Sequence, residues 1–270
     1  MNEPSSSPPG GSGPALPPTP ATQAVRVAMP AGVPSATYAI LGITVAIYAL
    51  QLGSVFLFGY ANRAAQMDWL EFYGARITPL IRAGEIWRLI TPAFLHASPP
   101  HILFNMYALF SFGAVLERFF GHRRFLLLYA LAAFSGNVFS FLLGSENGFS
   151  VGASTAIFGL VGAQGVFLYQ NRKLFGSQFN RAIGNVIFIV VINLFLGLSP
   201  GIDNWGHIGG LLGGLIFTSF AGPRWDVEGV APDLRLVDER APRDVLNGAA
   251  AVILIFGSLA TLGMLYLPSR

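Results

Sequence analysis

One serine and one histidine in this sequence each sit among glycines at the start of a long apolar run. Ser154 lies in Val151–Gly159, which reads V-G-A-S-T-A-I-F-G, and His207 lies in the stretch D-N-W-G-H-I-G-G-L-L-G-G. A serine hydroxyl is a weak nucleophile until a neighbouring base, most often an imidazole, accepts its proton. We therefore consider Ser154 and His207 as the nucleophile and base of a hydrolase.

The glycines also suggest how the two side chains could meet. Small residues at spacings of four let two membrane helices touch backbone to backbone. One such face follows Ser154, and the other surrounds His207. The small residues of the two faces are Gly152, Ala153, Ala156 and Gly159, and Gly206, Gly209, Gly210, Gly213 and Gly214. Close packing of these faces would bring the imidazole within hydrogen-bond reach of the hydroxyl.

Acyl transfer also needs hydrogen-bond donors for the oxyanion of the tetrahedral intermediate. His101 and Asn105 are four residues apart, so on a helix both side chains lie on one face. Ser154 is predicted to begin a helix, which leaves its backbone N–H without an intrahelical partner. These three donors are the candidate oxyanion hole.

Composition places this chemistry in a membrane. The chain has 270 residues, of which 53% are hydrophobic and 11% charged, whereas a soluble domain carries about 25% charged residues. The net charge of +3 is too small to suggest nucleic acid, and the absence of cysteine excludes thiolate chemistry. There is no H-E-x-x-H motif for a metalloprotease and no pair of aspartates inside apolar segments. We therefore expect neither a metal nor a cofactor.

Hydropathy predicts an all-α polytopic membrane protein with seven spanning helices. Their expected ranges are 36–59, 101–120, 125–144, 154–169, 183–198, 205–220 and 245–267. The loop over 60–100 is apolar and aromatic, which favours short interfacial helices. The expected organisation is a disordered tail (1–33), a six-helix membrane domain (34–222), a polar linker (223–244) and a seventh helix with a short tail (245–270).

Basic residues predict the orientation. They gather between the second and third helices, between the fourth and fifth, and after the sixth, so the amino terminus is predicted in the cytoplasm and the carboxyl terminus outside. The residues concerned are Arg118, Arg123, Arg124, Arg172, Lys173, Arg181, Arg224, Arg235, Arg240 and Arg243. The arginines of the 60–100 loop break the rule, and we assign them to the membrane interface. The polar residues on helices two, four and six then share one depth near the outer surface.

Each residue also has an ordinary structural interpretation. A membrane serine often bonds a carbonyl one turn back, a lone histidine can be a packing residue, and His101 with Asn105 could cap a helix. Asp203, one turn before His207, could orient it. His96 and His122 are expected in loops, with no chemical role. A transporter with midplane polar groups is a further alternative, which the lack of an internal repeat in the sequence disfavours. The joint occurrence of Ser154, His207, His101 and Asn105 at one depth favours catalysis over these ordinary structural interpretations.

These motifs, taken in order over residues 36–222, resemble the rhomboid family of intramembrane serine proteases. The matching pieces are Trp87–Arg88, His101-x-x-x-Asn105, Gly113-x-x-x-Glu117-Arg118, Gly152-x-Ser154 and His207-x-x-Gly210-x-x-x-Gly214. The resemblance implies a six-helix rhomboid-like bundle with the seventh helix as a carboxyl-terminal addition. It also implies a Ser154–His207 dyad, an oxyanion hole that includes His101 and Asn105, and packing of Phe158 on the histidine.

The implied activity is endopeptidase cleavage of single-span membrane proteins near the outer leaflet, with lateral entry of the substrate from the bilayer. The implied location is the plasma membrane of a prokaryote, and the oligomeric state stays open. The alternative is a catalytically silent relative that binds membrane proteins for trafficking or quality control. One departure from the family pattern is Thr155, where glycine usually follows the nucleophile. We expect this threonine to push the sixth helix slightly outward.

Overall fold

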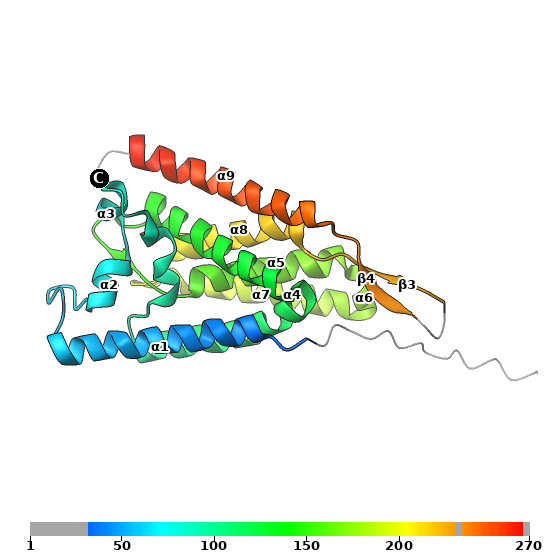
Figure 1. Ribbon diagram of the computed structural model, residues 1–270, viewed down its shortest axis with the longest axis horizontal. Helices are drawn as coiled ribbons and strands as arrows, with labels where there is room; N and C mark the ends of the chain where they lie inside the picture. Colours follow the sequence, from blue (N-terminus) through cyan, green and yellow to red (C-terminus); the bar gives the residue numbers. More distant parts are fainter. Residues whose placement is uncertain (1–31, 231–233, 267–270) are drawn as a thin grey trace, which may run out of the picture.

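The computed structural model describes residues 32–230 and 234–266, and within them the protein is a bundle of helices with two small antiparallel strand pairs (Figure 1). All but the last two residues of the tail expected over 1–33 lie outside the described residues. The long helices are α1 (Ser35–Phe58), α4 (Pro99–Leu143), α5 (Ser154–Gln170), α7 (Phe179–Leu196), α8 (Asn204–Ala221) and α9 (Pro242–Tyr266).

Helix α4 contains two membrane segments. Gly121 interrupts it with φ 73° and ψ 160°, a conformation that glycine adopts without a steric cost. The ring of Phe125, beyond the break, lies against Gly113, before it, so the two halves fold back on each other. The halves correspond to the expected helices 101–120 and 125–144. The all-α fold of six helices plus a seventh is thereby confirmed.

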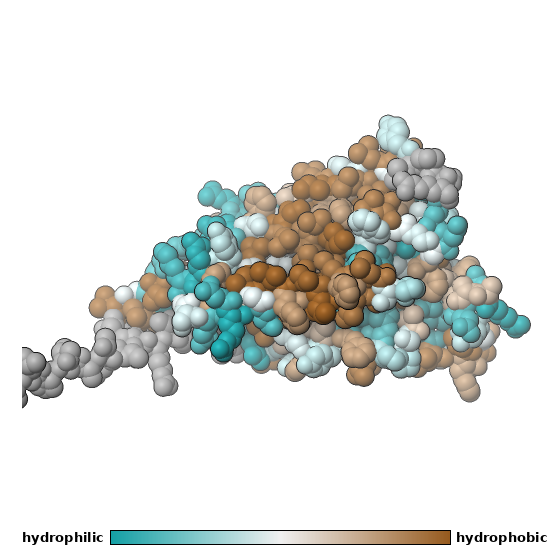
Figure 2. Space-filling model, turned by 180° about the vertical axis from the view of Figure 1, so that it is seen from behind, coloured by the Kyte–Doolittle hydropathy of each residue, from teal (hydrophilic) through white to brown (hydrophobic). Residues whose placement is uncertain are grey.

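Four helices in the described part of the chain are long and apolar enough to cross a membrane, namely α1, α4, α9 and the stretch Arg172–Leu196 that contains α7. Large hydrophobic side chains are exposed along their outer faces. On the face shown in Figure 2, hydrophobic residues cover the middle of the molecule and hydrophilic residues gather toward its two ends. A hydrophobic middle of this kind fits the hydrocarbon layer of a bilayer.

The remaining elements are short and connect the long helices. They are α2 (Trp69–Gly74), β1 (Arg76–Ile77), α3 (Thr78–Arg82), η1 (Ile86–Leu89), η2 (Thr91–Phe94), β2 (Phe149–Ser150), α6 (Arg172–Phe175), η3 (Gly176–Gln178), β3 (Trp225–Glu228) and β4 (Arg235–Asp238). Four of them, α2, α3, η1 and η2, are short helical segments within the 60–100 loop. The polar linker expected over 223–244 contains the hairpin of β3 and β4.

The core of the bundle is α8, held between α5 and the second half of α4. A Cβ atom added at Gly210 would collide with the carbonyl oxygen of Thr155, and one at Gly214 would collide with that of Gly159. A Cβ atom at Gly209 would lie 2.6 Å from the carbonyl oxygen of Ser135 on α4. Glycine is therefore required at these positions, and the sequence pattern translates into backbone contact on two sides of α8.

Helix α1 is anchored to α4 by one carboxylate. Pro34 precedes α1 and provides no side-chain cap. The buried Glu117 accepts hydrogen bonds from the backbone N–H groups of Ala36 (2.8 Å) and Thr37 (2.7 Å) and from the Thr37 hydroxyl (2.6 Å). These are the free donors of a helix start, where negative charge is also favoured. His122, next to the turn at Gly121, contacts the same carboxylate.

The first loop is fixed by a buried arginine. The guanidinium of Arg88 donates to the carbonyl oxygens of Ala75 (2.8 Å) and Phe72 (2.9 Å) and to Glu85 (2.7 Å). Strand β1 then pairs with β2, so that Ile77 lies opposite Phe149. Because β2 ends four residues before Ser154, this pairing connects the first loop to the segment that carries the serine.

Candidate active site

Ser154 and His207 meet at one end of the bundle. Each lies within the first four residues of its helix, Ser154 in α5 and His207 in α8. The Ser154 Oγ atom lies 3.0 Å from Nε2 of His207. This distance is a normal hydrogen bond, and it connects two residues that are 53 positions apart in the chain.

The imidazole of His207 is buried and held by packing. Its ring lies flat against that of Phe158, with centroids 4.2 Å apart and planes 10° from parallel. Its Nδ1 atom has no hydrogen-bond partner among the described residues. The pair therefore has no third member in the described part of the chain.

Asp203, which the sequence left open as a partner of His207, is occupied elsewhere. Its carboxylate caps α8 by accepting from the backbone N–H of Gly206 at 2.9 Å, and it also accepts from the hydroxyl of Ser140 on α4. These contacts give Asp203 a structural role at the start of α8.

His101 reaches the same site through Gly152. With φ at +130°, Gly152 occupies a conformation that residues with a side chain rarely adopt. A Cβ atom at this position would lie 2.7 Å from Nε2 of His101 and 3.6 Å from Oγ of Ser154. The bare glycine thus lets the histidine ring and the serine hydroxyl approach the same point on the backbone.

In the structure, the side-chain amide of Asn105 donates a hydrogen bond within its own helix, whereas an oxyanion hole needs a donor that faces the substrate. Its Nδ2 atom donates to the carbonyl oxygen of His101, one turn earlier in α4, at 3.0 Å. An amide nitrogen carries two hydrogens, so one donor remains for a bound group. The side chain is 6% exposed.

His96 is the residue whose importance the sequence did not reveal. Expected to lie in a loop without a chemical role, it is 1% exposed, and its ring packs edge-on against His101 with centroids 5.0 Å apart. Its Nε2 atom faces the backbone N–H of Ala153, directly before Ser154, at 3.4 Å. Burial, followed by the charge of His101, lowers the pKa of His96 to about 3, so its ring stays neutral and can accept this hydrogen.

A buried glutamine supports His96 from the first helix. Gln51 accepts from the backbone N–H of His96 at 3.0 Å and donates to Asp68 at 2.7 Å. Asp68 in turn caps α2 by accepting from the backbone of Leu70 and Glu71. The only sequence signal for this arrangement was a second histidine five residues before His101, since its partners lie 45 and 57 residues away.

Thr155 fits between neighbouring helices without separating Ser154 from His207. Its side chain packs against Gly136 of α4 and Gly206 of α8, where added Cβ atoms would lie 2.6 Å from its Cβ and 3.0 Å from its Cγ2. Its hydroxyl is buried and has no hydrogen-bond partner in the described residues. The glycines opposite Thr155 leave the room that its side chain takes.

The structure is thus that of a polytopic membrane protein in which a serine and a histidine from two helices are in contact at one end of the bundle. The sequence agrees with that class, because residues 83–224 match the model of the rhomboid domain. The chain belongs to the rhomboid family.

Several relatives align with the chain. It is 42% identical over 176 residues to the rhomboid protease GluP of Bacillus subtilis, an alignment that covers 64% of this chain and 34% of that protein. It is 40% identical over 148 residues to RHOMBOID-like protein 1 of Arabidopsis thaliana, covering 54% and 38%. It is 37% identical over 147 residues to rhomboid-like protease 1 of Toxoplasma gondii, covering 54% and 50%. The chain thus spans between a third and a half of these relatives' length.

Proposed function

We propose that this protein is an intramembrane serine endopeptidase that cleaves single-span membrane proteins by a Ser154–His207 dyad. The observation that carries the proposal is the 3.0 Å contact between the serine Oγ and the histidine Nε2. The relative named as a protease in Bacillus subtilis supports the same reaction class.

In the first step, Nε2 of His207 accepts the hydroxyl proton as Ser154 Oγ attacks the carbonyl carbon of the scissile bond. This requires the tautomer with the hydrogen on Nδ1. The imidazolium then gives its proton to the leaving amine, the C–N bond breaks, and an acyl-enzyme remains on Ser154. Water, deprotonated by the same imidazole, attacks this ester and releases the acid and the free serine.

The oxyanion of each tetrahedral intermediate needs donors beside Ser154. The backbone N–H of Ser154 at the start of α5, the ring of His101 across Gly152 and the second amide hydrogen of Asn105 are our candidates. The positive end of α5 adds a favourable potential at the same place.

The substrates that we propose are transmembrane helices that reach the site sideways from the bilayer and are cut near the outer surface. The arginines between α5 and α7 and after α8 support an orientation with the opposite end, which carries Ser154, facing outward. The plasma membrane of a prokaryote is the location we propose.

Cleavage of a model substrate tests the proposal. Purified protein in liposomes should cut a single-span fusion protein, whereas Ser154→Ala and His207→Ala should each reduce the rate by at least about a thousandfold. Ser111→Ala is a matched control, because that hydroxyl bonds the Tyr107 carbonyl on its own helix at 2.8 Å. Equal cleavage by wild type and Ser154→Ala would refute the dyad. No cleavage by the wild type of any tested substrate would favour the silent, substrate-binding alternative.

A further inference from the structure

A second feature of the bundle lies far from Ser154, between α5, α7 and α8. It is a cavity of about 520 Å³ whose walls are almost entirely apolar. The end of the cavity nearer to Ser154 is formed by Gly162 and Leu211. The end farther from Ser154 is formed by Tyr169, Ser219 and Arg224. Because Gly162 is eight residues beyond Ser154 on α5, the cavity begins about 12 Å from the serine.

The cavity exists because α7 packs loosely. Val186 is the one buried residue of α7, whereas α5 and α8 are buried along much of their length. On the α5 side, Gly165 offers no side chain to fill the space, and a Cβ atom there would meet only Val186, at 3.5 Å. Ile187 and Val191 of α7 line the cavity and are 57% and 61% exposed, so the space opens toward the bilayer.

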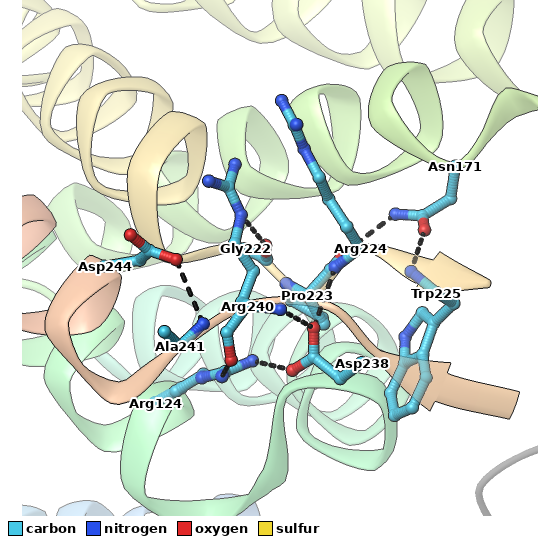
Figure 3. A network of polar contacts seen from close by, with 10 residues as sticks. All are labelled: Arg124, Asn171, Gly222, Pro223, Arg224, Trp225, Asp238, Arg240, Ala241 and Asp244. Atoms are coloured by element: carbon cyan, nitrogen blue, oxygen red, sulfur yellow. Dashed lines mark hydrogen bonds and ion pairs between the residues drawn. The ribbon is translucent and has the colours of Figure 1, made fainter.

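The end of the cavity farther from Ser154 carries the positive charge of Arg224. Arg224 lies there as part of the contacts around Asp238 (Figure 3), whose carboxylate accepts from the backbone N–H groups of Arg224 and Arg240, each at 3.0 Å, and from the Arg124 side chain. The carboxylate of Asp238 thus accepts hydrogen bonds from three arginine residues.

The guanidinium of Arg224 takes no part in this network, to which Arg224 contributes only its backbone N–H. Figure 3 shows it pointing away from Asp238, and it makes no hydrogen bond or ion pair with any described residue. The guanidinium of Arg240, in contrast, is bound to the carbonyl oxygens of Gly222 (3.1 Å) and Ser219 (2.7 Å). Within the described part of the chain, the Arg224 guanidinium therefore has no counter-charge, and it lies at the polar end of this apolar cavity, which opens as a groove toward the bilayer.

From this arrangement we infer that the groove between α5, α7 and α8 binds an anionic phospholipid, with acyl chain in the groove and phosphate on Arg224. Apolar walls suit a hydrocarbon chain, and a planar guanidinium suits the oxygens of a phosphate. A neutral transmembrane helix would leave this charge without a partner. The inference does not depend on the proposed catalytic activity, because the groove is separate from Ser154 and His207.

The test compares lipid retention by the full chain in native mass spectrometry. Purified protein is mixed with equal amounts of phosphatidylglycerol and phosphatidylcholine that carry the same acyl chains. Wild type should retain the anionic lipid about fivefold better, the preference expected for one basic residue at a membrane surface. Arg224→Gln should abolish this preference, and Arg224→Lys should keep most of it.

Two further variants separate the parts of the site. Arg235→Gln is the matched control, because this arginine is exposed on β4 and only loosely paired with Glu228, at 3.6 Å. It should keep the wild-type preference. Val191→Trp, at the apolar end, should reduce retention of both lipids. Thermal unfolding of each variant checks that it is folded.

Three results would overturn the inference. The first is an equal preference for phosphatidylglycerol in wild type and in folded Arg224→Gln. The second is displacement of the lipid by inorganic phosphate alone, which would mean that Arg224 binds a free ion without using the groove. The third is displacement by a neutral hydrophobic helical peptide with no effect of Arg224→Gln, which would make the groove a surface for helices.

Discussion

The ring of Phe158 lies one helical turn beyond Ser154 and stacks on the imidazole of His207, 4.2 Å away between centroids. Because Nδ1 of His207 has no hydrogen-bond partner in the described residues, the ring is held by this stacking together with the hydrogen bond between Nε2 and Ser154. In the proposed mechanism Phe158 is thus a positioning residue, because it holds the ring whose Nε2 accepts the serine proton.

Phe158→Leu should therefore lower kcat by about two- to tenfold, the range expected for loss of one aromatic contact. KM should stay unchanged, because the substrate does not contact this ring in our account. Phe158→Tyr should restore most of the rate. Steady-state cleavage of a model substrate gives both constants. A rise in KM with unchanged kcat would contradict the positioning role.

Gly210 of α8 lies against the backbone of α5, where an added Cβ atom would collide with the carbonyl oxygen of Thr155. Gly210→Ala should force the helices apart, which costs about 1–3 kcal/mol in overpacking, and should lengthen the Ser154–His207 contact. We expect a lower thermal midpoint and at least a tenfold loss of cleavage. Gly184→Ala, on α7 with no atom within 4 Å of the added Cβ, is the control and should keep both. Equal effects of the two variants would argue against a helix contact at Gly210.

Thr155 buries a hydroxyl without a partner in the described residues, whereas its Cβ and Cγ2 fill space between Gly136 and Gly206. Thr155→Val keeps the shape and removes the unsatisfied polar group, so it should raise the free energy of unfolding by about 1 kcal/mol. Cleavage should persist. Denaturant unfolding in micelles measures the change, and destabilisation by valine would indicate a hydrogen bond that the account omits.

The first loop should give the protein a pH dependence through Glu71. Burial, and next the charge of Asp68, raise the pKa of Glu71 from 4.5 to about 7. The folded state therefore holds this proton more tightly than the unfolded chain. The resulting stabilisation is complete below pH 4.5 and is lost as the pH rises through 7.

Glu71→Gln should remove this contribution, since an amide does not titrate but still can accept from the backbone N–H of Asp68. Between pH 5 and pH 8 the thermal midpoint of wild type should fall by a few degrees more than that of the variant. Parallel melting curves at the two pH values measure it. An identical pH dependence in both proteins would refute the role of Glu71.

Much of the fold followed from local patterns in the sequence. Apolar segments predicted the spanning helices, and the glycines around His207 predicted backbone contact between α5 and α8. These predictions were possible because the apolarity of a membrane helix and the spacing of glycines along one face can each be read from a single short stretch of sequence.

Features that depend on distant partners did not follow from the sequence. The backbone N–H of His96 donates to Gln51 and its ring accepts from the backbone N–H of Ala153, and no local pattern in the sequence predicts either contact. Asn105 bonds the His101 carbonyl, a choice of hydrogen bond that residue spacing does not decide. The hairpin after α8 had a readable signal, since Trp225–Glu228 alternates large apolar and charged residues, but the charges of the segment favoured a linker.

The central claim is that His207 activates the hydroxyl of Ser154, and a fluorophosphonate probe tests it most directly because it reacts only with an activated serine. Wild type and Ser111→Ala should be labelled, with the adduct on Ser154 in peptide mass spectrometry. Folded Ser154→Ala and His207→Ala should stay unlabelled. Labelling of His207→Ala at the wild-type rate, or an adduct on another residue, would contradict the account.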